Sequence, residues 1–495
     1  MKITFLHRQY ADDNGDLNEL YGSDDDAALR DHFEKYGADE RRGVNLPDYM
    51  RVEKVVLSEE GHVCISGWAD RRMVDNVTLI LTVGYLRYEI DNLREALCWY
   101  RRQDVAEAIG DFERPSGYVM ITRLPEFRPH SEVTVMIRDK TYYDHKMMRL
   151  HSVQSFMAEA LSTCAVMADR PVGSTLPLAE RLAPDFQELW QTYLGRLGFS
   201  CLYEAGRDRP VERSIIITIY RDVSMLLPQL ETLAPGIAGQ PVEVVVVLNE
   251  FNGEVQPLVE QLAAFGQIHD ISLSLHQCSG NSGFSAGNNH GAKVARGEVL
   301  IFMNPDIFPP EGQEEQAFAF LHGDPGEGLD GALLYYGDGS LMHSGMYTTA
   351  DMAVDARLGY AAPVLRVEHY GKGLTAHVDD SAAELAEDLR NVPEEGLLVT
   401  AALWRIRKSV FDEMGQLPTD YIIAYYEDAD FCLKMLEAGR PVRLDRGSRW
   451  IHMEGVGKPK PPLMRAVMWL NRAFYSRRFA NSQFLAPAST DLSQL

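Results

Sequence analysis

Alternating strand-like and helix-like segments dominate the chain from Ser214 onward. The runs "SIIITIY", "VEVVVVLNE" and "ISLSLHQC" are continuously apolar and rich in β-branched residues, and "VSMLLPQLETLA" and "VQPLVEQLAAFG" between them have helical periodicity. Continuous hydrophobicity is typical of strands that are buried on both faces of a parallel sheet. The pattern therefore predicts an α/β sheet of βαβ units, whose ligands bind beyond the carboxyl ends of the strands.

A fourth apolar run, "VLIFM", ends at Asn304-Pro305-Asp306. The tripeptide alone is ordinary turn chemistry. The alternative is a carboxylate presented at the end of a parallel strand, where such sheets hold ligands. The preceding segment "SGNSGFSAGNNHGAKVA" favours the alternative, because its glycines let the backbone approach a ligand and its asparagines supply amide groups. Its spacing is neither GxGxxG nor a P-loop, which argues against a dehydrogenase or an NTPase.

The chain of 495 residues is too long for one ordinary core, so several domains are expected. Composition and periodicity predict five parts: an acidic helical cap (1–50), a β-sandwich (51–148), a helical connector interrupted by a loop at "RPVGSTLP" (149–211), the α/β domain (212–460), and a basic amphipathic helix with a tail (461–495). The predicted fold class is therefore multidomain α/β.

Charge and cysteine content exclude several classes of protein. A formal net charge of -24 argues against nucleic acid as a partner. The six cysteines include no CxxC pair, so neither a disulfide framework nor a zinc site is indicated. The sequence shows no secretory signal and no apolar run of roughly 20 residues, so we expect a cytoplasmic protein.

Several motifs follow one another in a fixed order: "RSIIITIYRD", "EVVVVLNE", "GNSGFSAGNNHGAKVARGEVLIFMNPD", "DGSLMHSG", "TAALWRIRKSVFDEMG", "YYEDADFCLKMLEAG" and "WIHMEG". Over residues 212–480 this series resembles family 2 glycosyltransferases of the GT-A fold. Residues 51–148, with "ISGWAD" and "SGYVMI", resemble an accessory β-sandwich module beside bacterial glycosyltransferase domains. The resemblance implies inverting transfer of a sugar from a nucleotide diphospho-sugar to a saccharide hydroxyl, in bacterial surface or exopolysaccharide synthesis.

The resemblance also implies a divalent cation, Mn²⁺ or Mg²⁺, at the acidic strand-end motif, which is usually Asp-x-Asp. Here Asn304 replaces the first Asp, so Asp306 is the expected ligand, with Asn304 nearer the ribose or a metal-bound water. His452 in "WIHMEG" matches a histidine that completes the metal site in several relatives; a purely structural histidine is the alternative, and Glu454 is a weaker candidate. A hard cation suits the chemistry, because the leaving diphosphate develops negative charge.

The segment "YYEDAD" supplies the predicted catalytic carboxylates. Acidic residues in the first turn of a helix are also favoured by the helix dipole, which is a sufficient structural reason for some of them. An inverting transfer needs a carboxylate within reach of the acceptor hydroxyl. By match to the family motif this role goes to Asp428, with Glu427 orienting the acceptor or the loop, and Asp430 is expected to point elsewhere.

The remaining site residues follow from the resemblance alone. Asn249 stands where relatives carry an Asp that reads uracil, so the base stays open between UDP- and dTDP-linked donors. For Trp404, core packing is the alternative to an acceptor contact. The predicted donor-binding residues are Thr218, Tyr220, Arg221, Asp222, Asn249, Asn281, Gly283, Asn288 and Asn304, and the predicted acceptor-side residues, for an oligosaccharide or lipid-linked saccharide, are His343 and Trp404.

Three alternatives remain open at this stage. The α/β domain could be catalytically degenerate in a carbohydrate-binding protein that acts through its β-sandwich, which the substitutions at Asn304 and Asn249 favour. A nucleotidyltransferase would use a similar sheet, but the expected basic triphosphate loop is missing. Residues 461–480 could contact the inner face of a membrane or pack on the catalytic domain.

Overall fold

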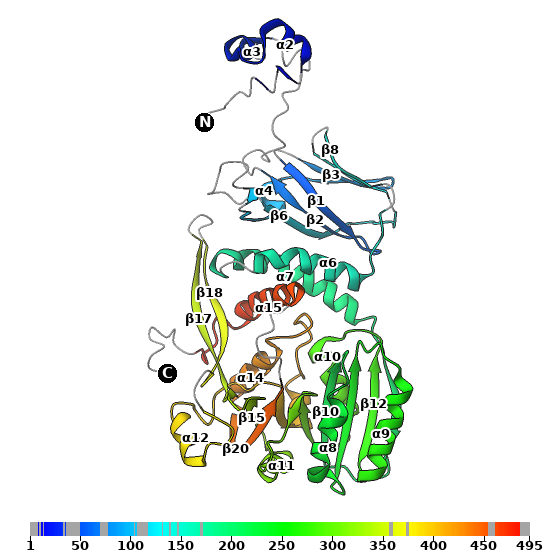
Figure 1. Cartoon of the computed structure of the whole chain (residues 1–495), viewed down its shortest axis with the longest axis vertical. Helices are drawn as coiled ribbons and strands as arrows, with labels where there is room; N and C mark the ends of the chain where they lie inside the picture. The colour runs from blue at the N-terminus through cyan, green and yellow to red at the C-terminus, as the bar shows by residue number, and fades with distance from the viewer. Residues whose placement is uncertain are drawn as a thin grey trace. The chain divides into compact units, whose positions relative to one another are not determined.

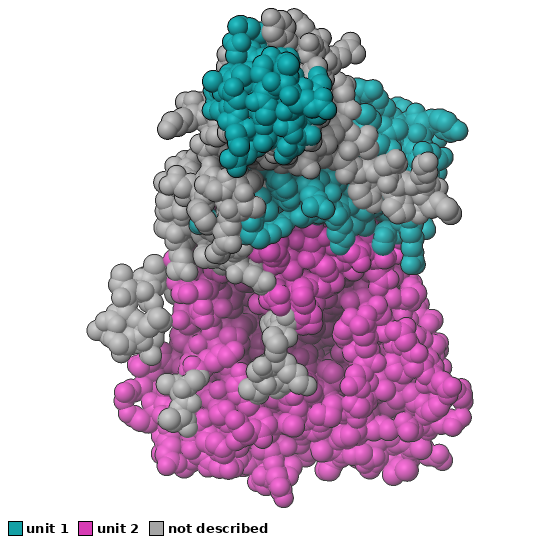
Figure 2. Space-filling view, turned by 45° about the horizontal axis from the view of Figure 1, so that its top comes forward, with its two compact units in different colours: residues 1–151 teal, residues 152–495 magenta. Residues whose placement is uncertain are grey.

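The computed structural model describes residues 8, 11–12, 14–32, 35, 50–69, 78–102, 104–105, 117–130, 132–137, 140–145, 148–168, 172–355, 360–372, 376–453 and 461–485. The chain forms two compact units, Met1–His151 and Ser152–Leu495 (Figures 1 and 2). All but the first three residues of the predicted connector (149–211) belong to the second unit, together with the α/β domain and the C-terminal helix.

The first unit contains two antiparallel sheets over a shared core. One sheet has the order β1 (Met50–Leu57), β2 (His62–Ala69), β6 (Gly117–Arg123), β5 (Cys98–Tyr100), and the other β4 (Leu86–Ile90), β3 (Leu79–Val83), β7 (Val133–Ile137), β8 (Lys140–His145). Ile65 of the first sheet and Leu81 of the second are wholly buried in one apolar cluster, which is the arrangement of a β-sandwich. The described residues of this unit also form the short helices α2 (Gly15–Tyr21), α3 (Asp26–His32) and α4 (Leu93–Ala96).

Two corrections concern the predicted helical connector. The segment "VGSTLP", expected in a loop, is part of α7 (Val172–Leu194), which follows α6 (Val153–Ala168) and contains Pro177 and Pro184. Residues Phe199–Ala205 form a strand, β9, and not a helix. β9 pairs antiparallel with β12 at the edge of the large sheet, and these ladder hydrogen bonds satisfy the backbone groups that face β12.

The predicted βαβ units are present in the second unit (Figure 1). β10 (Arg213–Tyr220) pairs in parallel with β11 (Val242–Asn249), and β11 with β12 (Ser272–Cys278). β13 (Val299–Met303) then returns to the other side of β10, again in parallel. The strand order therefore reverses at β10, and a crevice at such a switch point is the usual ligand site of an open α/β sheet.

Helices cover both faces of this parallel part. α8 (Leu226–Ile237) and α9 (Val255–His269) bury leucines in one apolar cluster, whereas α10 (Gly283–Val294) contributes Ala292 to the cluster on the other face. Burial on both faces explains why β11 is apolar along nearly its whole length.

The sheet continues beyond β13 with mixed pairing in the order β19 (Leu403–Arg407), β15 (Leu329–Tyr336), β20 (Val442–His452), β14 (Ile307–Phe308), and β16 (Leu341–His343) pairs with β15. β17 (Met346–Asp355) and β18 (Tyr360–His369) form a separate hairpin. The helices of this half are α11 (Glu314–His322), α12 (Ala382–Asp388), α13 (Lys408–Glu413) and α14 (Glu427–Glu437). The helix α12 begins with a capping box between Ser381 and Glu384.

The C-terminal helix α15 (Pro462–Phe479) lies against α6, α7 and β18 (Figure 1). Trp469, Leu470 and Tyr475 on its apolar face are buried. The apolar face of α15, which could have contacted a membrane, is therefore packed against the rest of the protein. Within the described ranges, no helix is both long and apolar enough to cross a bilayer.

Candidate active site

Asp306 and His452, the two predicted metal ligands, lie side by side. β14 begins immediately after Asp306 and pairs antiparallel with the end of β20, with Ile307 opposite His452. This pairing places Asp306 Oδ1 3.1 Å from His452 Nε2, and the Met453 amide donates to the Asp306 carbonyl at 2.9 Å. His452 Nδ1 is buried and has no hydrogen-bond partner among the described residues.

The turn at 304–306 is held from two sides. Gln229 of α8, wholly buried, donates through Nε2 to the carbonyls of Asn304 (2.6 Å) and Ile307 (2.9 Å). On the other side, the Asn304 amide donates to the Ala402 carbonyl at 2.8 Å. Sequence reasoning missed Gln229, although a glutamine on the apolar face of "LLPQLETLAPGI", beside Leu226 and Leu230, was a visible signal.

Asp306 and His452 fit a divalent cation in their chemistry. A carboxylate oxygen and an imidazole nitrogen suit Mn²⁺, and Asp306 Oδ1 and His452 Nε2 already lie 3.1 Å apart. Mg²⁺ and similar ions often take only one or two protein ligands and complete their shell with water and substrate phosphate. Among the residues that the structure describes, no group of three potential ligands occurs, and the weaker candidate Glu454 lies outside them.

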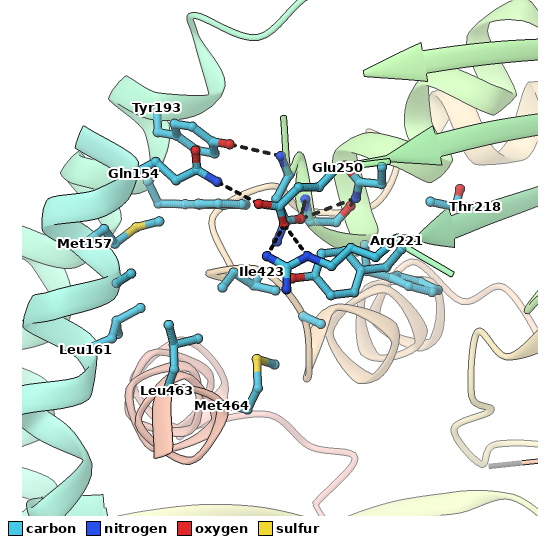
Figure 3. Close-up of a pocket in the computed structure, with 18 residues that line it drawn as sticks. Gln154, Met157, Leu161, Tyr193, Thr218, Arg221, Glu250, Ile423, Leu463 and Met464 are labelled. Atoms are coloured by element: carbon cyan, nitrogen blue, oxygen red, sulfur yellow. Dashed lines mark hydrogen bonds and ion pairs between the residues drawn. The ribbon is translucent and has the colours of Figure 1, made fainter. Parts of the chain in front are cut away.

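A cavity of about 420 Å³ opens beyond the carboxyl ends of β10 and β11 (Figure 3). Its polar side comes from these strand ends and from the loop before α10, and its apolar side comes from α6 and α15. Of the predicted donor-binding residues, the cavity is lined by Thr218, Tyr220, Arg221, Asn249, Asn281 and Gly283; Asp222, Asn288 and Asn304 do not line it.

Glu250, which the sequence analysis missed, binds several side chains on the polar side of the cavity (Figure 3). Its carboxylate accepts hydrogen bonds from Arg221 Nε (3.1 Å) and Gln154 Nε2 (3.1 Å). Burial, and next the Glu250 carboxylate, raise the pKa of the Tyr220 hydroxyl to about 12. Arg221 and Glu250 both have positive φ (62° and 53°), a costly conformation that is common at functional sites.

Asn249 lines the cavity, but its amide group is fully used within the protein. Oδ1 accepts from the Ser282 amide (2.6 Å) and hydroxyl (3.0 Å). Nδ2 donates to the Gly283 carbonyl (3.0 Å) and to Asn281 Oδ1 (3.4 Å). The Asn249 side chain therefore fixes the glycine- and asparagine-rich loop, and its predicted contact with the donor stays a prediction.

Three other predicted donor residues are explained by local structure. Asn288 is buried and accepts the Thr218 hydroxyl at 3.0 Å, so it orients a cavity residue from behind. Asp222 accepts the Ser224 amide at 2.9 Å, and this hydrogen bond lowers the pKa of its carboxyl. Gly283 has φ +71°, and a Cβ there would lie 2.6 Å from the Ile423 carbonyl oxygen. Only glycine fits at that position.

The carboxylates of Glu427 and Asp428 begin α14 and differ in environment. Glu427 is almost fully buried, and its Oε2 has no hydrogen-bond partner in the described part of the chain. Burial, and next the Asp428 carboxylate, raise the pKa of Glu427 to about 8. Asp428 is half-buried and accepts amides of Ala429 (2.8 Å) and Ala401 (3.4 Å); burial still raises its pKa. The carbonyl of the next residue, Ala402, accepts the Asn304 amide. Residues 401–402 therefore contact both Asp428 and the turn that carries Asp306.

Asp430 points away from the site, as expected. It is wholly buried and accepts the Tyr421 hydroxyl at 2.9 Å. It also forms ion pairs with Lys434 (3.1 Å) and with Arg478 of α15 (3.1 Å). Its role is therefore to attach α14 to the C-terminal helix.

The predicted acceptor-side residues are both buried. His343 Nδ1 lies 3.1 Å from His369 Nδ1, its Nε2 accepts the Thr400 amide at 3.4 Å, and burial holds the pKa of its imidazole well below the usual value. His343 thus lies beneath the segment that contacts Asp428. Trp404 is corrected to a core residue: β19 runs inside the sheet, and the indole packs between Phe302 and Phe431, with no exposed surface.

Comparison with known sequences assigns the family of the α/β domain. Residues 214–345 match the family described as "Glycosyl transferase family 2". This part of the chain is a family 2 glycosyl transferase domain. The predicted family and fold class are confirmed for it, and the match does not extend to the N-terminal sandwich.

A curated relative and several solved structures resemble this chain. The "Uncharacterized protein y4gI" of Sinorhizobium fredii (strain NBRC 101917 / NGR234) is 26% identical over 281 residues; the alignment covers 56% of this chain but only 28% of that protein. GalNAc-T7 with UDP, GalNAc and Mn2+ is 17% identical (TM-score 0.35, covering 53% of this chain and 48% of that one).

Two further structures are a mannosyltransferase and a staphylococcal protein. PcManGT from Pyrobaculum calidifontis, in complex with GDP-Man and Mn2+, is 14% identical (TM-score 0.34, 65% of this chain and 82% of that one). S. aureus TarS 1-349 is also 14% identical (TM-score 0.31, 55% and 74%). These global similarities are low, and the fold assignment rests on the family match and the strand order.

Proposed function

We propose that the chain transfers a sugar from a nucleotide diphospho-sugar to a saccharide hydroxyl, with a divalent cation and with inversion at the anomeric carbon. The observation that carries the proposal is the arrangement at the carboxyl ends of the parallel strands of a family 2 domain. The cavity lies beyond β10 and β11, and the Asp306–His452 pair follows the neighbouring strand β13. The acceptor would be an oligosaccharide or lipid-linked saccharide in bacterial surface or exopolysaccharide synthesis.

The cavity suits the nucleoside end of the donor. Its volume of about 420 Å³ is within the range of small-molecule sites, and Tyr220, half exposed at its rim, offers a ring to a base. Arg221 cannot neutralise a diphosphate alone, because it is already paired with Glu250. An acidic chain therefore needs another source of positive charge for this donor.

Asp306 and His452 would hold that cation, Mn²⁺ or Mg²⁺. When bound, the ion would neutralise charge on the leaving diphosphate. The buried Gln229 keeps the turn that carries Asp306 in place through the carbonyls of Asn304 and Ile307.

Asp428 is the proposed general base. Two neighbouring buried carboxylates do not both ionise easily, and the proton stays on the one that is less solvated. Glu427 is more buried and lacks a partner at Oε2, whereas Asp428 accepts two backbone amides that stabilise its charge. Asp428 is thus the better acceptor for the proton of the attacking hydroxyl, and displacement by that hydroxyl inverts the anomeric centre.

The location of the protein is part of the proposal. We expect it in the cytoplasm, where nucleotide sugars are the donors. Contact with the inner face of a membrane through residues 461–480 would have to use the polar side of α15, because its apolar side is buried against the protein.

Titration calorimetry with UDP- and dTDP-sugars, with and without Mn²⁺, tests the proposal, followed by transfer assays with saccharide acceptors. We expect metal-dependent donor binding that Asp306→Ala abolishes and Asp428→Asn keeps, while both variants lose transfer. Full transfer by Asp428→Asn would refute the assignment of the base. Absence of any metal-linked nucleotide binding would instead favour the degenerate, carbohydrate-binding alternative, which the single acidic residue of the strand-end motif motivates.

A further inference from the structure

The loop that leads into the catalytic carboxylates has an unusual backbone. Residues 421–426 immediately precede Glu427, the first residue of α14. Ile423, Tyr425 and Tyr426 have positive φ (60°, 82° and 75°). Such conformations are costly for β-branched and aromatic residues, and they persist only where surrounding contacts impose them.

Asn471, in the middle of α15, supplies those contacts. Its Oδ1 accepts the Ile422 amide at 3.0 Å, and its Nδ2 donates to the carbonyls of Ile422 (3.0 Å) and Ala424 (2.8 Å), with Tyr425 at 3.4 Å. The side chain is only 2% exposed, so no water competes for these groups. Asparagine is a poor helix former. All of these hydrogen bonds of its side-chain amide are made with the loop, and none of them with the backbone of α15.

The loop is also attached on its opposite side. The Ile423 carbonyl accepts the Phe284 amide at 2.7 Å, at the beginning of α10. Ile423 and Ala424 line the cavity, and so do Leu463 and Met464 from the start of α15 (Figure 3). One stretch of backbone therefore connects the wall of the cavity to the carboxylates that follow it.

α15 contacts the β17–β18 hairpin as well. The Tyr475 hydroxyl lies 2.7 Å from the Thr348 hydroxyl of β17, and the Leu365 amide of β18 donates to the Ser476 hydroxyl at 2.9 Å. Arg478 pairs with Asp430 of α14 at 3.1 Å. The helix thus contacts the cavity, the carboxylate loop and the β17–β18 hairpin along its length.

We propose that Asn471 is a positioning residue of the active site: it clamps residues 422–425 and so sets where Asp428 stands relative to the cavity. The inference deepens the proposed function and rests on it for the catalytic role of Asp428. Asn471 itself touches no reacting group. The C-terminal helix, which the family match to residues 214–345 does not include, is on this view a part of the catalytic centre.

The decisive variant is Asn471→Asp, which keeps the size of the side chain and its acceptor oxygen. It replaces the donating NH₂ by an oxygen that faces three carbonyls. The hydrogen bonds to the loop are therefore lost, while the volume of the side chain stays the same and no cavity forms. Asn471→Ala is the second variant, in case the carboxylate prevents folding. Trp469→Phe is the matched control, because it removes another buried hydrogen bond of α15, from the indole to the Thr175 hydroxyl at 3.1 Å, away from the loop.

Two measurements on the full-length protein separate the possibilities. Hydrogen–deuterium exchange should accelerate about tenfold or more over residues 419–428 in Asn471→Asp and remain unchanged there in Trp469→Phe. With an active nucleotide sugar, kcat should fall about 100-fold in Asn471→Asp, since misplacement of a catalytic group by about 1 Å has that effect, while the donor KM changes by less than about fivefold.

Unchanged exchange over residues 419–428 in both Asn471 variants would overturn the clamp. Faster exchange with a kcat equal to that of Trp469→Phe would overturn the positioning role. If the wild-type protein turns over no nucleotide sugar, the proposed function fails, and the exchange comparison alone decides whether the clamp exists.

Discussion

Asn249→Asp separates two accounts of the donor site. Judged by the family resemblance, it restores the acidic residue that reads uracil, so UDP should bind more tightly. The structure predicts the reverse. Nδ2 donates to the Gly283 carbonyl at 3.0 Å and to Asn281 Oδ1 at 3.4 Å, and an aspartate would place a carboxylate oxygen against both acceptors.

The cost can be worked out from these contacts. Each buried acceptor that loses its donor costs about 1–3 kcal/mol, and the longer contact counts at the lower end, so Asn249→Asp should destabilise the protein by about 2–4 kcal/mol. The loop that contains Asn281 and Gly283 should also move. We therefore expect UDP affinity to fall by at least about tenfold, which corresponds to about 1.4 kcal/mol.

Urea denaturation and calorimetry with UDP and Mn²⁺ would measure the two effects. Asn252→Asp is the matched control, because it makes the same change of charge at an exposed position two residues beyond Glu250. Tighter UDP binding by Asn249→Asp, with a free energy of unfolding equal to that of the control, would refute the structural account of Asn249.

Three other changes test particular features of the site. Gln229→Leu leaves the carbonyls of Asn304 and Ile307 without their donor, so the protein should lose about 2–6 kcal/mol of stability and bind Mn²⁺ more weakly; unchanged Mn²⁺ affinity by calorimetry would contradict this. Gly283→Ala combines a φ of +71° with a Cβ 2.6 Å from a carbonyl oxygen, and it should lower the free energy of unfolding by more than about 1–3 kcal/mol and weaken donor binding; a wild-type urea midpoint would argue against it. Because burial raises the pKa of Glu427 to about 8, the folded state loses stability as the pH rises from the ordinary carboxyl range toward 8. Glu427→Gln removes this loss. Its free energy of unfolding relative to that of the wild type should therefore rise by at least about 1 kcal/mol between pH 5 and pH 8.5, and a difference independent of pH would refute the raised pKa of Glu427.

Local patterns were sufficient for the parallel half of the sheet. The runs that became β10, β11 and β12 are apolar on both faces, and the segments between them are amphipathic, so strand type and helix coverage follow from neighbours in the sequence. The meeting of Asp306 and His452 needed more, because it depends on the two-residue strand β14, which has no periodicity of its own. The family motifs predicted Asp306 and His452 as ligands of one cation. The pairing of β14 with β20 explains physically why the two side chains lie close together.

Other features depend on tertiary contacts that no local pattern contains. β9 is a strand because β12 offers it an unpaired edge, and "VGSTLP" is helical despite its glycine and proline. Trp404 occupied a family motif and still belongs to the core, since β19 lies between β13 and β15. Glu250 was missed because its partner Gln154 lies 96 residues away, on a helix outside the family match.

The substitution at Asn304 is best understood through what the surrounding structure does with that residue. The backbone of Asn304 is used twice, by Gln229 and by Ala402, so its position in the turn is fixed by main-chain bonds that any side chain would allow. The carboxylate of Asp306 is fixed separately, through β14 and the ring of His452. Replacing the first acidic residue of the motif by Asn therefore removes one negative charge without loosening Asp306, the proposed ligand. In a chain of net charge -24, a diphosphate approaching a cation held by Asp306 and His452 meets less repulsion with an amide at position 304 than with a carboxylate. The substitution is thus compatible with a working metal site.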